Sequence, residues 1–328
     1  MRNLTGLGAV VLVATACTSE SELRYTATLG VETNGVALSA DGLDAHAGMA
    51  ETTCTIDTNW ACPTSDVDLP TDEEKIFDHF GNTTLGASVE GVYLIRGSAW
   101  QQDEDLPIAS VRGASLLEGG TVMVAGTVTD CRVHRGLELS QEVPAALCEE
   151  GSHYAFDRDD GTVFAGTPEG VFRVTLEGWE SLDVYGDLIA WDHSLGLLYA
   201  ATSGDPKVLA IRPNGVTEWS AQASGPITSI AARGEHGEVM VLAEDRDGFG
   251  VIERREGETG ELLGRSRVPD ADGDLVVSEN GHTVAVVRND EVNFFGLDAG
   301  GAGPTVDDTP PVCLDLSTRE GGMSFGLD

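Results

Sequence analysis

Hydrophobic and polar residues alternate with a period of two along much of the chain, as is typical of half-buried β-strands. The clearest example is residues 162–176, where one alternating strand enters a Pro-Glu-Gly turn and a second alternating strand leaves it. A similar stretch occurs at residues 83–95, with Gly91 in the place of Gly170. The pattern therefore predicts a β-hairpin that is repeated along the chain.

The hairpin belongs to a longer unit, whose four successive strands we name A to D. Predicted A strands cover residues 35–40, 187–192, 227–232 and 274–278. Predicted B strands begin near Leu43, Thr83, Thr121, Thr162, Leu197, Glu238 and His282. Their spacing of about 35–45 residues is the period of four-stranded propeller blades.

Each unit has an apolar face that it cannot bury alone, and packing the units around an axis buries all of these faces. We therefore predict an all-β fold, a β-propeller of four-stranded blades, with seven blades and with six or eight as alternatives. Two packed sheets are the competing architecture, but they do not account for a constant period. The ring must close, and residues 23–31 or 312–317 are the candidates for the missing strand.

A few segments depart from the repeat. Residues 71–80 are compatible with one short helical turn. Residues 52–74 and 136–150 exceed the blade pattern and are interpreted as insertions. Residues 299–311 are rich in Gly, Pro and Asp and are interpreted as a linker.

The repeats resemble bacterial β-propeller repeats of the broad WD40-like, YVTN and regulator-propeller class. The resemblance covers roughly residues 35–300 and is carried by residues 164–172, 198–202 and 208–215. It implies the architecture and does not select a subfamily. Trp191-Asp192 ends a predicted A strand, whereas the Trp-Asp pair of WD40 repeats proper ends strand C, so that assignment is not made.

The N-terminal residues predict export. Arg2 precedes an apolar run from Leu4 to Ala16 that is too short to span a bilayer. The segment resembles a bacterial lipoprotein signal, which implies lipidation of Cys17, and an ordinary secretory signal cut near Ala16 is the alternative. The expected organisation is a signal peptide at 1–16, a tether at 17–24 and the propeller at 25–328. The expected location is the outer membrane or cell surface, with the periplasmic side as an alternative.

The charge balance restricts the partners. The chain has 19 basic and 55 acidic residues and a formal net charge of −36. Nucleic-acid binding depends on Lys and Arg releasing counterions from phosphates, and a strongly negative field repels polyanions. We therefore expect no nucleic-acid partner, and membrane contact through the lipid anchor alone. The net charge itself indicates a soluble protein surface rather than a particular binding site.

Five cysteines remain after Cys17. Exported chains meet oxidising conditions, so disulfides are expected. Proximity in sequence favours two pairs and leaves Cys313 over. The predicted disulfides are Cys54–Cys62 and Cys131–Cys148.

Asp270, Asp272 and Asp274 alternate around Gly273, which makes them a candidate calcium loop. Structural turns are the favoured interpretation, because no Glu occupies the twelfth position and Asp-Gly is common in hairpin turns. Residues 157–161 and 245–248 are weaker versions, each with an arginine that competes for the carboxylates. Apart from calcium, the sequence indicates no cofactor.

Three histidines fall in predicted A-to-B connections and would lie on one face of the ring: His193, His236 and His282. We interpret them as solvated turn residues many ångströms apart, because no ligand-spacing motif joins them.

No catalytic motif stands out, and neither a Gly-x-Ser-x-Gly sequence nor a phosphate-binding glycine loop occurs. The leading hypothesis is a non-enzymatic binding or scaffold module for an unidentified protein or small molecule. An enzyme with carboxylate or metal chemistry at the channel mouth is the alternative, and a passive repeat shell is a third reading.

Overall fold

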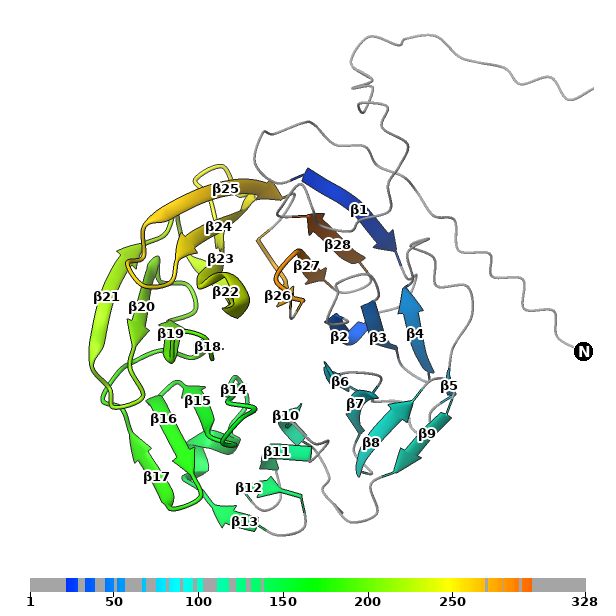
Figure 1. The fold of residues 1–328 in the computed structure, drawn as a ribbon. Helices are drawn as coiled ribbons and strands as arrows, with labels where there is room; N and C mark the ends of the chain where they lie inside the picture. The colour runs from blue at the N-terminus through cyan, green and yellow to red at the C-terminus, as the bar shows by residue number, and fades with distance from the viewer. Residues whose placement is uncertain are drawn as a thin grey trace, which may run out of the picture.

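The computed structural model describes residues 22–28, 33–38, 45–49, 52–56, 67–68, 75–80, 83–88, 91–96, 99–102, 111–117, 122–127, 131–136, 139–268, 271–278, 280–288 and 291–296. Their strands form seven antiparallel four-stranded sheets arranged in a ring (Figure 1). The predicted β-propeller is confirmed, and we number its blades in chain order.

The first three blades cover the N-terminal half of the ring. Blade 1 contains β2 (Thr33–Leu38), β3 (Ala45–Met49), β4 (Thr52–Ile56) and β5 (Val67–Asp68). Blade 2 contains β6 (Lys75–Phe80), β7 (Thr83–Ser88), β8 (Gly91–Arg96) and β9 (Ala99–Gln102). Blade 3 contains β10 (Val111–Leu116), β11 (Val122–Thr127), β12 (Arg132–Arg135) and β13 (Leu139–Glu142).

The next three blades have the same internal order. Blade 4 contains β14 (His153–Phe156), β15 (Val163–Thr167), β16 (Gly170–Thr175) and β17 (Gly178–Ser181). Blade 5 contains β18 (Leu188–Asp192), β19 (Leu197–Ala201), β20 (Lys207–Ile211) and β21 (Thr217–Gln222). Blade 6 contains β22 (Ile227–Arg233), β23 (Glu238–Glu244), β24 (Gly250–Glu256) and β25 (Leu262–Val268).

Blade 7 closes the ring with strands from both ends of the described chain. It contains β26 (Asp274–Val277), β27 (Thr283–Arg288), β28 (Glu291–Gly296) and β1 (Glu22–Thr28). β1 pairs with β28 as the outermost strand, so the first of the two predicted closing segments is correct (Figure 1). β1 begins at Glu22, inside the range predicted for the tether.

The core lies between the blades, because each strand sends alternate side chains to its two neighbours. On β27, Val284 and Val286 pack with residues of blade 6, whereas Ala285 and Val287 pack with residues of blade 1. All five residues of β19 are buried for the same reason. The A strands surround the axis and the D strands form the rim (Figure 1).

Three local expectations are corrected. Lys75–Phe80 is strand β6 and no helical turn, because pairing with β7 satisfies backbone groups that a single isolated turn would leave open. Thr52–Ile56 and Val67–Asp68 are blade strands within the predicted 52–74 insertion, as the β-branched residues of β4 favour. Leu139–Glu142 is likewise a blade strand within the predicted 136–150 insertion.

Two short 3-10 helices accompany the strands: η1 (Ala145–Cys148) and η2 (Gly234–His236). The predicted disulfide Cys131–Cys148 is present and ties η1 to the start of β12. Cys62, Cys313 and the segments 1–17 and 299–311 lie outside the described residues, so what the sequence indicates about them stays a prediction. Across the described residues, no helix has both the length and the apolar character needed to span a membrane.

Candidate functional site

The A-to-B turns of successive blades contact one another along one face of the ring. Asp192, at the end of β18, is fully buried and accepts hydrogen bonds from Leu195 N (3.1 Å) and Tyr199 Oη (3.3 Å). Burial, followed by the Asp192 charge, raises the pKa of Tyr199, which keeps this hydroxyl protonated as a donor. Ser194 bonds to Asp192 at 2.7 Å and also reaches the Gly234 carbonyl of blade 6. The Trp-Asp pair noted in the sequence is therefore structural.

The same kind of contact joins blades 6 and 7. Arg233, at the end of β22, is 2% exposed. Its guanidinium donates to the Gly281 carbonyl of blade 7 and to Glu238 Oε2 at 2.7 Å. These turns connect neighbouring blades at the ends of their innermost strands, the A strands.

The three histidines lie in A-to-B connections, as predicted, but not all of them stand apart. The rings of His236 and His282 have centroids 5.2 Å apart, so the expected wide separation is wrong for this pair. The two rings are close because the A-to-B turn of blade 6 contacts the A-to-B turn of blade 7. In this contact His236 Nε2 lies 3.0 Å from Asn280 O.

His193 meets the 157–161 turn of the preceding blade. Its Nε2 lies 3.2 Å from Asp159 Oδ2, and its Nδ1 lies 3.7 Å from Asp157 Oδ1. The expected competition from Arg158 does not arise, because this arginine pairs with Asp78 Oδ1 of blade 2 at 2.6 Å. Sequence spacing could not reveal this group, since its members come from two blades.

The other aspartate turns differ from it. Asp245 Oδ1 accepts from Asp247 N (2.8 Å) and Phe249 N (3.0 Å), while Arg267 lies 3.3 Å from Asp245 Oδ2. These contacts lower the pKa of Asp245, with the Phe249 N–H contributing most. This turn is structural, as the sequence reading favoured.

The calcium hypothesis at Asp270, Asp272 and Asp274 stays a prediction. Asp270 lies outside the described residues, and Asp272 and Asp274 are exposed around the start of β26.

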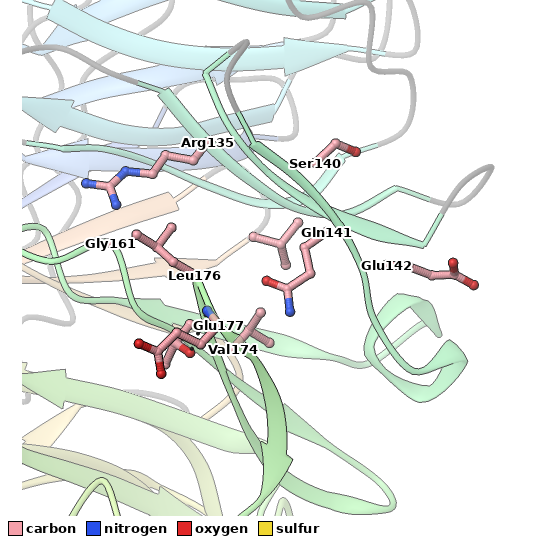
Figure 2. A pocket seen from close by; sticks show the side chains of 10 residues that line it. Arg135, Ser140, Gln141, Glu142, Gly161, Val174, Leu176 and Glu177 are labelled. Carbon is pink, nitrogen blue, oxygen red and sulfur yellow. Dashed lines mark hydrogen bonds between the residues drawn. The ribbon is translucent and has the colours of Figure 1, made fainter.

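A cleft of about 370 Å³ lies between blades 3 and 4, and we call it the 3–4 cleft. Figure 2 shows Gln141 of β13 and Val174 of β16 facing each other across it, with Arg135 toward one end and Glu142 toward the other. The lining residues are Val133, Arg135, Ser140, Gln141, Glu142, Gly161, Val174, Thr175, Leu176 and Glu177.

Apolar side chains reach the surface beside this cleft. Leu176, in the turn between β16 and β17, is 55% exposed, and Trp179, near the start of β17, is 50% exposed. A second hollow of about 480 Å³ continues from the cleft over Trp179 and shares Thr175, Leu176 and Glu177 with it. Large apolar residues at a turn, where polar ones are usual, were the sequence signal that could have indicated this surface.

The charged side chains around the cleft and the second hollow are mainly acidic. Both basic groups are engaged: Arg135 Nη1 donates to Asp160 O at 3.1 Å, and Arg173 pairs with Glu180 at 3.3 Å. Four carboxylates against two guanidinium groups give a local balance of −2, from Glu142, Asp160, Glu177, Glu180, Arg135 and Arg173.

Comparison with known proteins identifies the architecture. No family model matches the chain, and no curated protein matches it. A solved chain from a structure described as "Crystal Structure of Mitotic Checkpoint Complex" is similar, with a TM-score of 0.64 and 11% identity, over 88% of this chain and 98% of that one. A likeness at this identity shows the fold alone, and the chain therefore folds as a β-propeller.

Proposed function

We propose that the protein is a non-enzymatic binding module that holds a basic, partly apolar polypeptide segment in the 3–4 cleft. The observation that carries the proposal is the pair of half-exposed residues Leu176 and Trp179 beside a cleft with acidic surroundings. An exposed aromatic and aliphatic pair next to a concavity is typical of a contact surface.

Charge complementarity selects the class of partner. The local balance of −2 and the net charge of −36 both attract a basic segment and repel an acidic one. Apolar side chains of the segment would contact Leu176 and Trp179, while its Lys and Arg residues would lie near Glu142 and Glu177. Such binding weakens as salt screens the charges.

The test is a fluorescence polarisation titration with short synthetic peptides in which Lys and Arg alternate with Leu and Trp. Acid-for-base versions of the same peptides are the control ligands. The wild-type chain is expected to bind the basic peptides more tightly, and to lose affinity with added salt. Equal binding of the acidic peptides would contradict the proposal.

A pair of variants localises the binding. Leu176→Asn removes an apolar contact and is expected to weaken binding about tenfold, since burying a leucine contributes about 1.5–3 kcal/mol. Leu263→Asn changes a 41% exposed leucine of β25 on blade 6 and should leave binding unchanged. Equal effects of both substitutions would remove the 3–4 cleft from the proposal.

We further propose that the module is exported and anchored by lipid on Cys17. The lipoprotein-like residues that end at Cys17 support this proposal. Cys17→Ala should move the protein from the detergent phase to the aqueous phase when cells are fractionated. A variant that still partitions into detergent would contradict the anchor and leave the cleft proposal intact.

A further inference from the structure

We propose that Asp157, Asp159 and His193 form a binding site for a divalent transition-metal ion of the zinc type, which would join blades 4 and 5. One ligand atom from each residue lies within 4.8 Å of the other two. His193 Nε2 and Asp159 Oδ2 are 3.2 Å apart. Ligand atoms of a tetrahedral zinc ion with bonds of about 2.1 Å are about 3.4 Å apart, so this edge already has the needed length.

The backbone of the aspartate turn is held in place without the ion. Asp157 N donates to Thr162 O at 2.8 Å, and Gly161 N donates to Asp157 O at 2.9 Å. Asp160 points back into the turn, where its Oδ1 accepts from Thr162 N at 2.7 Å. The turn therefore presents Asp157 and Asp159 on the side of His193, and Asp157 Oδ1 is held there by a hydrogen bond from Asp159 N at 3.0 Å.

Arg158, the residue between the two aspartates, does not neutralise them in this structure. Arg158 is directed away to Asp78, whose other oxygen accepts from Ser115 Oγ (2.8 Å) and Leu116 N (2.9 Å) of blade 3. Asp78 thus anchors the one guanidinium in this turn. The negative charge of Asp157 and Asp159 is left facing the imidazole of the next blade.

The ligand chemistry favours a particular class of ion. An imidazole with two carboxylates suits zinc and its neighbours in the first transition row, whereas calcium and magnesium prefer oxygen ligands alone. The side chains of His193 and Asp159 are 62% and 52% exposed, so water can complete the coordination and both can rotate to close the longer edges. Asp157, at 13%, is the least exposed of the three and would set the position of the ion.

A simple ion pair between a protonated imidazole and the two carboxylates is the competing explanation for the geometry. It predicts no specific ion uptake at neutral pH. Metal binding instead predicts uptake that needs both the imidazole and the carboxylates. The two explanations are separated by titration of the whole chain with metal.

The experiment uses the full, tag-free chain after dialysis against a chelator, titrated at neutral pH with Zn²⁺ in a calorimeter and with Co²⁺ by visible absorption. We expect one ion per chain, a visible Co²⁺ band from protein ligands, and a higher melting temperature with Zn²⁺. His193→Ala and Asp159→Asn should each weaken binding at least about tenfold, since even residues that only orient a ligand contribute that much. Circular dichroism confirms that each variant is folded.

His236→Ala is the matched control, because His236 is also an exposed histidine of an A-to-B turn but its ring neighbour is His282. It should bind Zn²⁺ as the wild type does. The proposal is overturned if millimolar Zn²⁺ neither binds nor shifts the melting temperature. It is equally overturned if His193→Ala and Asp159→Asn bind as the wild type does. These outcomes leave the polypeptide proposal untouched, because the 3–4 cleft lies at another blade junction and the peptide titration can be run with a chelator present.

Discussion

The junction between blades 3 and 4 is open at its outer part, whereas the junction between blades 5 and 6 is filled. Both are built from the same repeat, and both have an apolar inner core. At the 5–6 junction, Trp219 of β21 covers the outer part and its Nε1 donates to Gly257 O of blade 6 at 2.7 Å. At the 3–4 junction, the cleft lies in the corresponding region.

The outermost strands of the two blades present different residues to the following blade. Trp219 pairs across the sheet with Ala210, and Gln141 pairs with Val133 in the same way. Ala210 and Val133 both pack toward the following blade, but they differ in place along the repeat, because Ala210 pairs with Tyr199 whereas Arg135 has the matching pairing with Met123. Gln141 therefore matches Ala221 of blade 5, which pairs with Val208, and no tryptophan lines the 3–4 cleft.

Blade 6 adds a buried charged group that has no counterpart among the residues lining the 3–4 cleft. Glu253 is fully buried and contacts Arg255 at 2.5 Å, Arg265 at 3.1 Å and Ser224 N at 2.9 Å. Arg255 also donates to the Gln222 carbonyl of blade 5 at 2.6 Å. The comparison teaches that a propeller can keep an apolar inner core at both junctions while the outer residues vary. These outer residues decide whether a given junction is closed or open.

The largest effect is expected at the sealed junction. Glu253→Ala leaves the Arg255 charge buried without its carboxylate, which should lower the free energy of unfolding by about 3–5 kcal/mol. Chemical denaturation measures the loss. Glu180→Ala, which breaks the exposed pair with Arg173, is the control and should cost at most about 1 kcal/mol. A similar small loss for both variants would mean that the buried group does not hold blades 5 and 6.

A somewhat smaller effect is expected from the disulfide beside the open junction. Replacing Cys131 and Cys148 by serine removes a cross-link between residues 17 apart in sequence, which should cost about 3 kcal/mol. Denaturant midpoints of the two proteins give the difference. An unchanged midpoint would show that packing of the fully buried Leu147 is sufficient to hold this segment.

Trp219→Gln removes the indole that covers the outer part of the 5–6 junction and tests the comparison directly. The variant loses the packing of a half-buried indole and the bond to Gly257 O, so we expect a loss of about 2 kcal/mol, below the range for a fully buried tryptophan. The thermal midpoint should fall, and a hydrophobic dye should report the newly opened surface. Full stability would contradict the role of Trp219 as the seal.

The smallest effect concerns pH at the blade 6 turn of Asp245. The pKa of this carboxyl is lowered in the folded state, so its contribution to stability is present at neutral pH and is lost as pH falls through the folded pKa. The melting temperature of wild type and Asp245→Asn should therefore differ at neutral pH and converge in acid. A constant difference across the acid range would contradict the assignment.

The repeat could be predicted from the sequence because period-two alternation and turn residues are local signals. The unit at 162–176 and the similar stretch at 83–95 were sufficient to predict the propeller architecture. The cleft and the His193 group could not be predicted, because each combines residues of different blades whose contact depends on how the blades pack. The strand at Lys75–Phe80 was missed for the same reason, since its partner β7 and its burial decide its conformation.

The account rests most directly on the claim that the 3–4 cleft, which Gln141 lines, is a binding surface. The deciding measurement is the titration of Gln141→Trp with the basic, apolar peptides, together with its melting temperature. We expect an indole at position 141 to fill the cleft that Gln141 lines, with a melting temperature at or above that of the wild type and binding lost. A stable Gln141→Trp variant that binds the peptides with wild-type affinity would contradict the account.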